Sequence, residues 1–295
     1  MSKIIVIAGP TATGKTKLSI ELAKEYKACI INADSTQVYT EPQIATAKIK
    51  ENEKEGITHY LIDMTSLDND YSLFDYQHDA RTILNKLIEN DKNVIIVGGS
   101  GLYLKALLYD YKLEESPIKR VDYSEYTNEE LKNLADNIDP NNDIHTNNRQ
   151  RLERYITYFN TFKKVMSKSD DINKRVYDFI LIGLKASRED LYKMTDNRVD
   201  SMFKDGLLDE ARKLYEMNLK NYSNIIGYKE LKKYFEGKIS LEEAKEEMKK
   251  NTRHYAKRQY TWFNNQMKDI IWVDVDYNNF DNTINKVKEI IKKDS

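Results

Sequence analysis

Eight residues near the start of the chain have the spacing of a loop that binds phosphate. They fit the pattern G-x-x-x-x-G-K-[ST] and lie between a short apolar run and a segment of helical spacing, which is the context that this motif requires. In such a loop the backbone N–H groups and the N-terminus of the next helix face phosphate oxygens. The residues are Gly9, Pro10, Thr11, Ala12, Thr13, Gly14, Lys15 and Thr16. The motif predicts that Lys15 reaches the terminal phosphate and that the Thr16 hydroxyl binds Mg²⁺, but it does not identify a reaction.

Two acidic residues could complete such a site. Asp34 closes the second apolar run, at 28–33, which the usual strand order places next to the phosphate loop. Its carboxylate could act as a base on a bound acceptor, or it could cap the segment that follows. Asp63 follows the apolar residues 60–62 and could hold a metal ion or serve as a turn residue.

Basic residues gather in two further segments. Arg253, Lys257 and Tyr260 fall at i, i+4 and i+7, so a helix there would carry a cationic and aromatic face. Such a face can follow a phosphate backbone, although it can also be an ordinary solvated surface. The second cluster comprises Gln150, Arg151, Leu152, Glu153 and Arg154. Together the two clusters favour an RNA or nucleotide acceptor, which the net charge of −1 alone does not indicate.

The elements that must position these residues follow from the alternation of apolar runs and helical spacing. Strands are predicted over residues 4–8, 28–33, 59–64, 93–97 and 176–184, and helices over 15–26, 72–90 and 102–108. This order predicts an α/β fold with a parallel sheet flanked by helices, as in P-loop NTPases. The loops at Gly9, Asp34 and Gly98 should converge beyond the carboxyl ends of the strands. The apolar run 270–273 could be one more strand or a docking segment.

The pattern changes in the middle of the chain and predicts an insertion. Residues 112–175 are charged, tyrosine-rich and helical in spacing, so we expect an inserted all-helical subdomain there. Residues 1–111 and 176–295 would then form the P-loop core, with helices near its carboxyl end. A length of 295 residues suffices for one α/β domain with such an elaboration.

Composition limits the environment and the chemistry. No apolar stretch is long enough to cross a bilayer, and the first residues do not fit a signal peptide, so we expect a cytoplasmic protein without a membrane partner. The single cysteine, Cys29, excludes an internal disulfide, and its apolar surroundings predict a buried thiol. The four histidines lack metal-ligand spacing. We expect the protein to act as a monomer.

Six segments taken together resemble the tRNA dimethylallyltransferase (tRNA isopentenyltransferase) family, and the likeness extends over most of the chain. They are the phosphate loop 9–16, Asp34-Ser35-Thr36-Gln37-Val38-Tyr39, the glycine-rich segment 98–107, Arg198-Val199-Asp200 with Gly206-Leu207, the segment 226–230, and the segment 255–263.

The resemblance implies transfer of a dimethylallyl group from its pyrophosphate to the N6 amine of the adenosine 3′ of the anticodon. By family analogy Asp34 accepts a proton from that amine, Lys15 and a Mg²⁺ ion on Thr16 stabilise the leaving pyrophosphate, and Ser100 and Arg198 orient the reacting groups. The residues implied to contact tRNA are Asp34, Ser35, Thr36, Gln37, Gln150, Arg151, Leu152, Glu153, Arg154, Arg253, Lys257 and Arg258. They would hold the anticodon stem-loop around an adenosine that has left its stack.

Two other functions fit the same loop. A nucleoside or nucleotide kinase would bind ATP there and transfer a phosphoryl group to a small acceptor. An RNA-binding module gated by a nucleotide would use the loop only to sense its ligand.

Overall fold

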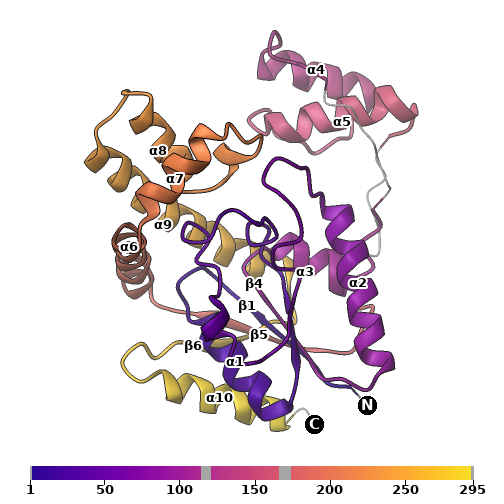
Figure 1. The fold of residues 1–295 in the computed structure, drawn as a ribbon. Coiled ribbons are helices and arrows are strands. Elements are labelled where there is room, and N and C mark those ends of the chain that lie inside the picture. Colours follow the sequence, from indigo (N-terminus) through magenta and orange to yellow (C-terminus); the bar gives the residue numbers. More distant parts are fainter. Residues whose placement is uncertain (1, 114–120, 166–173, 294–295) are drawn as a thin grey trace. The chain divides into compact units, whose positions relative to one another are not determined.

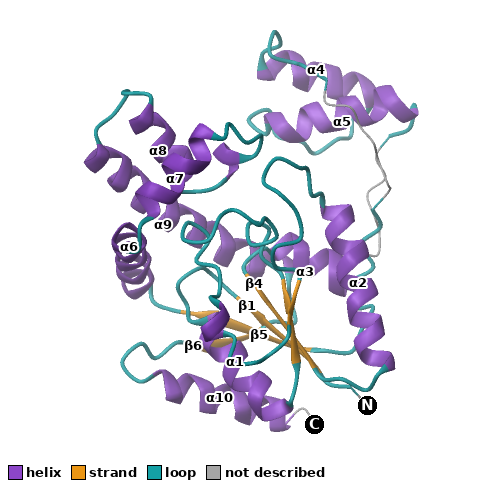
Figure 2. Ribbon diagram, in the orientation of Figure 1, coloured by secondary structure: helices purple, strands orange, loops and turns teal. Residues whose placement is uncertain are grey.

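The computed structural model describes residues 2–113, 121–165 and 174–293, and the chain divides into two compact units. The first combines the residues up to Asp110 with those from Arg175 onward, and the second is Tyr111–Lys174. These boundaries lie one residue from the limits of the insertion inferred from the sequence. Figures 1 and 2 show the helices and strands of both units.

The first unit is built on a six-stranded sheet in the order β3-β2-β4-β1-β5-β6, in which every pairing is parallel. Its strands are β1 (Ile4–Ala8), β2 (Cys29–Asn32), β3 (His59–Tyr60), β4 (Val94–Gly98), β5 (Ile180–Lys185) and β6 (Ile271–Asp274). The third strand covers only the start of the expected 59–64, because Leu61 and Asp63 take positive φ angles that end it. The strand expected over 176–184 begins later, at Ile180. The run 270–273 proves to be an edge strand beside β5.

Helices cover both faces of this sheet, which explains why its central strands are continuously apolar. Ile4, Val6 and Ala8 of β1 pack with α2 (Leu73–Glu89), α3 (Gly101–Leu108) and the end of α9 (Leu241–Gln266). Ile5 and Ile7 point to the opposite face and pack with α1 (Lys15–Tyr26) and α10 (Phe280–Lys293). The sheet therefore lies between two helical layers, with its strands at the centre of Figure 2.

A helical subdomain of the same unit follows β5. It contains α6 (Arg188–Lys204), α7 (Leu207–Glu216), α8 (Tyr228–Phe235) and the short 3₁₀ helix Tyr222–Asn224, and another 3₁₀ turn, Glu51–Glu53, lies earlier in the chain. These helices share a core that includes Met248 from the first half of α9. Helix α9 begins at a capping box in which Ser240 and Glu243 bond each other's backbone N–H groups. Its second half packs on the sheet, so this one helix joins the subdomain to the sheet.

The second unit contains α4 (Asn128–Ile138) and α5 (Arg149–Phe162), which pack around a small apolar core. The cluster expected to contact RNA lies on α5. Gln150, Arg151 and Arg154 are exposed, whereas Leu152 is fully buried in that core. Leu152 therefore cannot contact RNA in the folded unit, and the expectation for this residue has to be corrected: its position, two after Gln150, turns it to the inner face of the helix.

Two expectations from composition can be compared with the structure. Cys29 is half-buried rather than buried, because it is the first residue of β2. Among the described residues, no helix has both the length and the apolar character that crossing a bilayer requires.

Candidate active site

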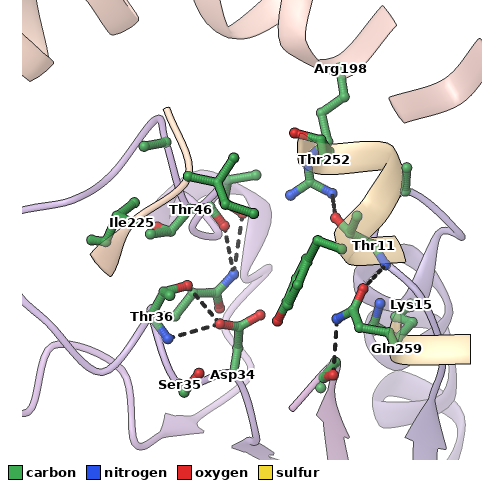
Figure 3. A pocket seen from close by; sticks show the side chains of 18 of the residues that line it. Thr11, Lys15, Asp34, Ser35, Thr36, Thr46, Arg198, Ile225, Thr252 and Gln259 are labelled. Carbon is green, nitrogen blue, oxygen red and sulfur yellow. Dashed lines mark hydrogen bonds between the residues drawn. The ribbon is translucent and has the colours of Figure 1, made fainter. Parts of the chain in front are cut away.

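A cavity of about 340 Å³ opens in the first unit, where the loops after β1, β2 and β4 meet α6 and α9. Figure 3 shows Lys15, Arg198 and Asp34 on different sides of it. Of the residues predicted from the sequence, those that line the cavity are Thr11, Ala12, Gly14, Lys15, Thr16, Asp34, Ser35, Thr36, Gln37 and Arg198. Gly9, Pro10 and Thr13 of the phosphate loop are buried behind this lining.

The strand order differs from the one assumed for Asp34. Strand β4 lies between β2 and β1, so Asp34 does not follow a strand adjacent to the phosphate loop. It reaches the same cavity because the last residue of β4, Gly98, and the next residue, Gly99, have no side chains to fill the space between. A Cβ atom on Gly98 would lie 2.1 Å from the Ala33 carbonyl oxygen, so the close approach of the neighbouring backbone requires glycine there.

Two cationic side chains face the cavity from the phosphate loop and from α6. The Lys15 ammonium donates to the Pro10 carbonyl at 2.6 Å, and the Arg198 guanidinium donates to the Thr11 hydroxyl at 3.0 Å. Burial and the nearby Arg198 lower the pKa of Lys15 to about 7, although Asp34 opposes this shift. Burial likewise lowers the pKa of Arg198. Two half-buried cations that repel each other favour an anionic ligand that carries more than one charge.

Asp34 uses one carboxylate oxygen to shape its own turn. Oδ1 accepts hydrogen bonds from the Thr36 backbone N–H at 3.0 Å and from the Thr36 hydroxyl at 2.7 Å (Figure 3). Among the described residues none donates a hydrogen bond to Oδ2. Both readings of Asp34 from the sequence therefore have a basis in the structure: one oxygen caps a turn, and the other is available to a ligand.

Ser100 precedes α3 and bonds to the Asp34–Gln37 segment. Its hydroxyl accepts a hydrogen bond from the Ser35 N–H at 2.9 Å and lies 3.1 Å from the Ser35 hydroxyl. Ser100 thus acts on the cavity through Ser35, whose backbone it holds.

Gln259 of α9 is a site residue that the sequence did not single out. Its Oε1 accepts a hydrogen bond from the Thr11 N–H at 2.9 Å, and its Nε2 donates to the Gly99 carbonyl at 2.9 Å (Figure 3). It therefore ties the phosphate loop to the loop after β4, and one N–H of the expected phosphate cradle is already occupied. Its place in the segment 255–263, which carries the family resemblance, was the only available signal.

Tyr255, one turn earlier on α9, lines the same cavity. Burial, and then the charge of Asp34, raise the pKa of its phenol, so the hydroxyl stays protonated and can donate a hydrogen bond. The sequence analysis included Tyr255 only as the first residue of the segment 255–263, which carries the family resemblance. An apolar part of the lining comes from Val199, Met202, Ile225, Ile226 and Met248.

The basic residues of α9 do not share one exposed face. Arg253 turns to α6 and pairs with both oxygens of Asp196 at 2.7 Å. Lys257 and Arg258 are exposed and line an open groove along α9 that also includes Trp262. Of the three basic residues on α9 that were predicted to contact tRNA, Arg253 is thus engaged within the protein, because its position on the helix points it at an acidic neighbour.

Asp63 is a turn residue in this structure. Its φ of 58° lies in the left-handed region, and its carboxylate pairs with the buried Lys48 ammonium at 2.6 Å. Within the described parts of the chain no group of three or more His, Cys, Asp or Glu side chains could hold a metal ion. A metal in the cavity would therefore need most of its ligands from a substrate and from water.

Comparisons with known proteins identify the same family over most of the chain. The sequence model of the IPP transferase family matches residues 37–266. A tRNA dimethylallyltransferase from Anoxybacillus flavithermus is 41% identical over 300 residues, covering 98% of this chain and 96% of that protein. The chain belongs to the tRNA dimethylallyltransferase family. The family match begins after Asp34, but this relative's alignment covers nearly the whole chain.

Solved structures of the family agree with the fold. The tRNA isopentenylpyrophosphate transferase of Staphylococcus epidermidis is 38% identical and superposes with a TM-score of 0.76 over 100% of both chains. A eukaryotic dimethylallyltransferase acting on tRNA is 27% identical, with a TM-score of 0.82, over 100% of this chain and 79% of that one. The expected P-loop-like α/β fold is therefore confirmed. Membership of this family favours a prenyltransferase over the kinase and over the nucleotide-gated RNA-binding module.

Proposed function

We propose that this protein transfers a dimethylallyl group from dimethylallyl diphosphate to the N6 amine of the adenosine 3′ of the anticodon in tRNA. The observation that carries the proposal is that Lys15, Arg198 and Asp34 line one cavity, so that two cations and one carboxylate face a single reaction space. A diphosphate donor and an amine acceptor need these two kinds of group.

The cationic side of the cavity suits the donor. Diphosphate gains charge as the carbon–oxygen bond breaks, and Lys15 and Arg198 would stabilise that charge in surroundings that exclude much of the water. The Thr16 hydroxyl would hold Mg²⁺, with the remaining ligands supplied by diphosphate and water, as this ion prefers. When bound, the ion would neutralise charge on the leaving group.

The carboxylate side suits the acceptor. The N6 lone pair attacks C1 of the dimethylallyl group, the C1–O bond breaks, and its electron pair leaves with the diphosphate. The amine must also lose a proton, and the Oδ2 atom of Asp34 would accept it. Ser35, Thr36 and Gln37 would contact the base, and Ser100 would keep Ser35 in place.

The remaining partner is the anticodon stem-loop. Lys257 and Arg258 on α9, and Gln150, Arg151 and Arg154 on α5, would contact its backbone through exposed side chains. The adenosine would leave its stack to enter the cavity. We further propose that the enzyme works as a monomer in the cytoplasm, where tRNA is available.

The test is a transfer assay with labelled dimethylallyl diphosphate, Mg²⁺ and unmodified tRNA. We expect label at N6 of the adenosine next to the anticodon, located by nuclease digestion and mass spectrometry. ATP with a nucleoside acceptor serves as the comparison reaction. Folded protein that binds both substrates but leaves the tRNA unlabelled would refute the proposal, and turnover of ATP with phosphorylation of the nucleoside would indicate the kinase.

A further inference from the structure

One carboxylate outside the cavity is bonded to four donors. Glu210, on α7, accepts hydrogen bonds from three consecutive backbone N–H groups, those of Gln43 at 3.1 Å, Ile44 at 2.8 Å and Ala45 at 3.1 Å. The Tyr228 hydroxyl donates to the same carboxylate at 2.6 Å. Nothing in the reaction proposed above uses this residue.

The three N–H groups begin a tight turn, residues 43–47, that forms part of the cavity wall. Ala45, Thr46 and Ala47 all line the cavity. The turn closes through hydrogen bonds from the Ala47 N–H to the Ile44 carbonyl and from the Lys48 N–H to the Gln43 carbonyl. Successive N–H groups in such a turn form an anion-binding concavity, and Glu210 fills it.

The other end of this turn fixes the side chain of Gln37. The Gln37 Nε2 atom donates to the Thr46 carbonyl at 3.1 Å and to the Ala47 carbonyl at 3.5 Å. Because backbone carbonyls only accept hydrogen bonds, the amide cannot be reversed there. Gln37 lines the cavity, and its Oε1 atom is the polar atom of the side chain that these bonds leave available to a ligand. As an amide oxygen it can only accept a hydrogen bond.

We propose that Glu210 is a positioning residue for recognition of the acceptor base. It holds the 43–47 turn, the turn holds the Gln37 amide in one orientation, and Gln37 Oε1 then accepts a hydrogen bond from an N–H donor on the base. On adenine the edge donor is the exocyclic amine, so this device selects a base with an amine at that position. The inference rests on the proposed function.

Glu210→Gln separates this role from simple structural support. The substitution puts an amide donor against N–H groups that need an acceptor, while Ile44, Ala45 and Ala47 still pack against the helical core. We expect the variant to fold, with a loosened turn and a Gln37 amide free to rotate. Asp209→Asn is the matched control, because Asp209 is the exposed neighbour on the same helix and the change removes the same charge.

The quantity to measure is the ratio of the binding affinities for two anticodon stem-loops. Anticodon stem-loops that carry adenosine or purine riboside at the target position differ only in the exocyclic amine. We expect Glu210→Gln to lower the wild-type preference for adenosine by about fivefold, the worth of one hydrogen bond. The KM for dimethylallyl diphosphate should stay unchanged, and Asp209→Asn should match the wild type. Gln37→Ala should lower the preference equally, and the double variant Glu210→Gln/Gln37→Ala should add nothing further.

The inference fails if Glu210→Gln keeps the wild-type preference, or if the two substitutions have additive effects. If that variant proves unfolded by thermal melting, Tyr228→Phe keeps the packed ring and removes the 2.6 Å bond that orients the Glu210 carboxylate toward the turn. We expect a smaller loss of preference there, and an unaltered preference would also overturn the inference. Absence of dimethylallyl transfer by the wild type would instead refute the proposed function.

Discussion

At the scale of single residues, Asp34 offers the most direct test of the chemistry. Asp34→Asn keeps an oxygen that can accept the two hydrogen bonds from Thr36, so the turn should persist. It removes the base, and we expect turnover to fall on the order of 100-fold or more. The single-turnover rate measures this loss, whereas the equilibrium affinities for tRNA and for the donor should be retained.

Asp63→Asn is the comparison for Asp34, since Asp63 was the other acid that the sequence offered for this site. Because Asp63 pairs with Lys48 in a turn, its substitution should leave the single-turnover rate near that of the wild type. A normal rate in Asp34→Asn would exclude the base assignment.

Lys15 makes donor binding depend on pH. In the free protein its pKa is about 7, well below the ordinary value, and a bound diphosphate raises that pKa by favouring the charged form. Above pH 7 binding must therefore take up a proton. Between pH 7.5 and 9 we expect donor affinity to fall by up to about tenfold per pH unit, until the pKa of the complex is reached. Calorimetry in buffers of different ionisation enthalpy measures the proton uptake.

Lys15→Met is the control for that titration. It removes the titrating group, so donor binding should be weaker but should depend less on pH, with less proton uptake. Equal proton uptake by Lys15→Met and the wild type would show that another group titrates.

At the scale of elements, the connection between β6 and α10 supports the phosphate loop. The Tyr277 hydroxyl donates to the Ala12 carbonyl at 3.0 Å, and Ala12 has a positive φ of 65°. A Cβ atom on Gly14 would lie 2.4 Å from the Phe280 ring, so this segment lies directly against the loop. Burial raises the pKa of Tyr277 to about 12, which keeps the hydroxyl a donor at neutral pH.

We therefore expect Tyr277→Phe to raise the KM for the donor about three- to tenfold, through loss of this one hydrogen bond. The KM for tRNA should not change. Steady-state kinetics with each substrate varied in turn decides the matter, and equal changes in both KM values would mean that the segment has a general structural role instead.

Helix α9 contributes exposed charge as well as cavity residues. Lys257→Ala/Arg258→Ala should weaken tRNA binding and reduce the slope of log K against log salt by about 0.7–0.9 for each lost phosphate contact. Arg253 is left intact because it pairs with Asp196. Lys286→Ala/Lys292→Ala on α10 removes the same charge from exposed positions and should leave the slope unchanged. If both double variants have the same slope of log K against log salt, Lys257 and Arg258 do not contact tRNA and belong to an ordinary solvated surface.

At the scale of the whole molecule, the proposed function assigns the reaction to the first compact unit and some of the tRNA contacts to the second. Tyr109 and Arg175, at the ends of the first unit that flank the insertion, form an antiparallel bridge, and the Val176 N–H donates to the Leu108 carbonyl. Replacing residues 112–174 by a short Gly/Ser linker should thus leave the first unit folded.

We expect this deletion variant to bind donor diphosphate normally and to bind tRNA more weakly, because the α5 side chains are lost. Calorimetry with donor and a filter-binding assay with tRNA measure the two affinities. If the deletion variant binds tRNA with the wild-type affinity, the second unit does not contribute to RNA binding.

The sequence by itself determined the motif-bearing loops and the alternation of strands and helices, because a phosphate loop, an apolar strand and an amphipathic helix are local patterns. It also located the cavity-lining residues of the phosphate loop and of the segment Asp34–Gln37, but not Ala45, Thr46 and Ala47 further along the second loop. It did not determine the strand order, which places β4 between Asp34 and the phosphate loop. That order depends on how strands far apart in the chain pair, and no local pattern encodes it.

Only the tertiary structure decided which of the predicted side chains are available to contact a ligand. Leu152 is buried and Arg253 is paired, although both lie in segments that read as basic and polar. Gln259 and Glu210 act on loops at least 160 residues away in the chain, so no spacing along the sequence could have indicated them. Burial and long-range hydrogen bonds are properties of the packed molecule, whereas helix spacing and loop motifs are properties of neighbouring residues.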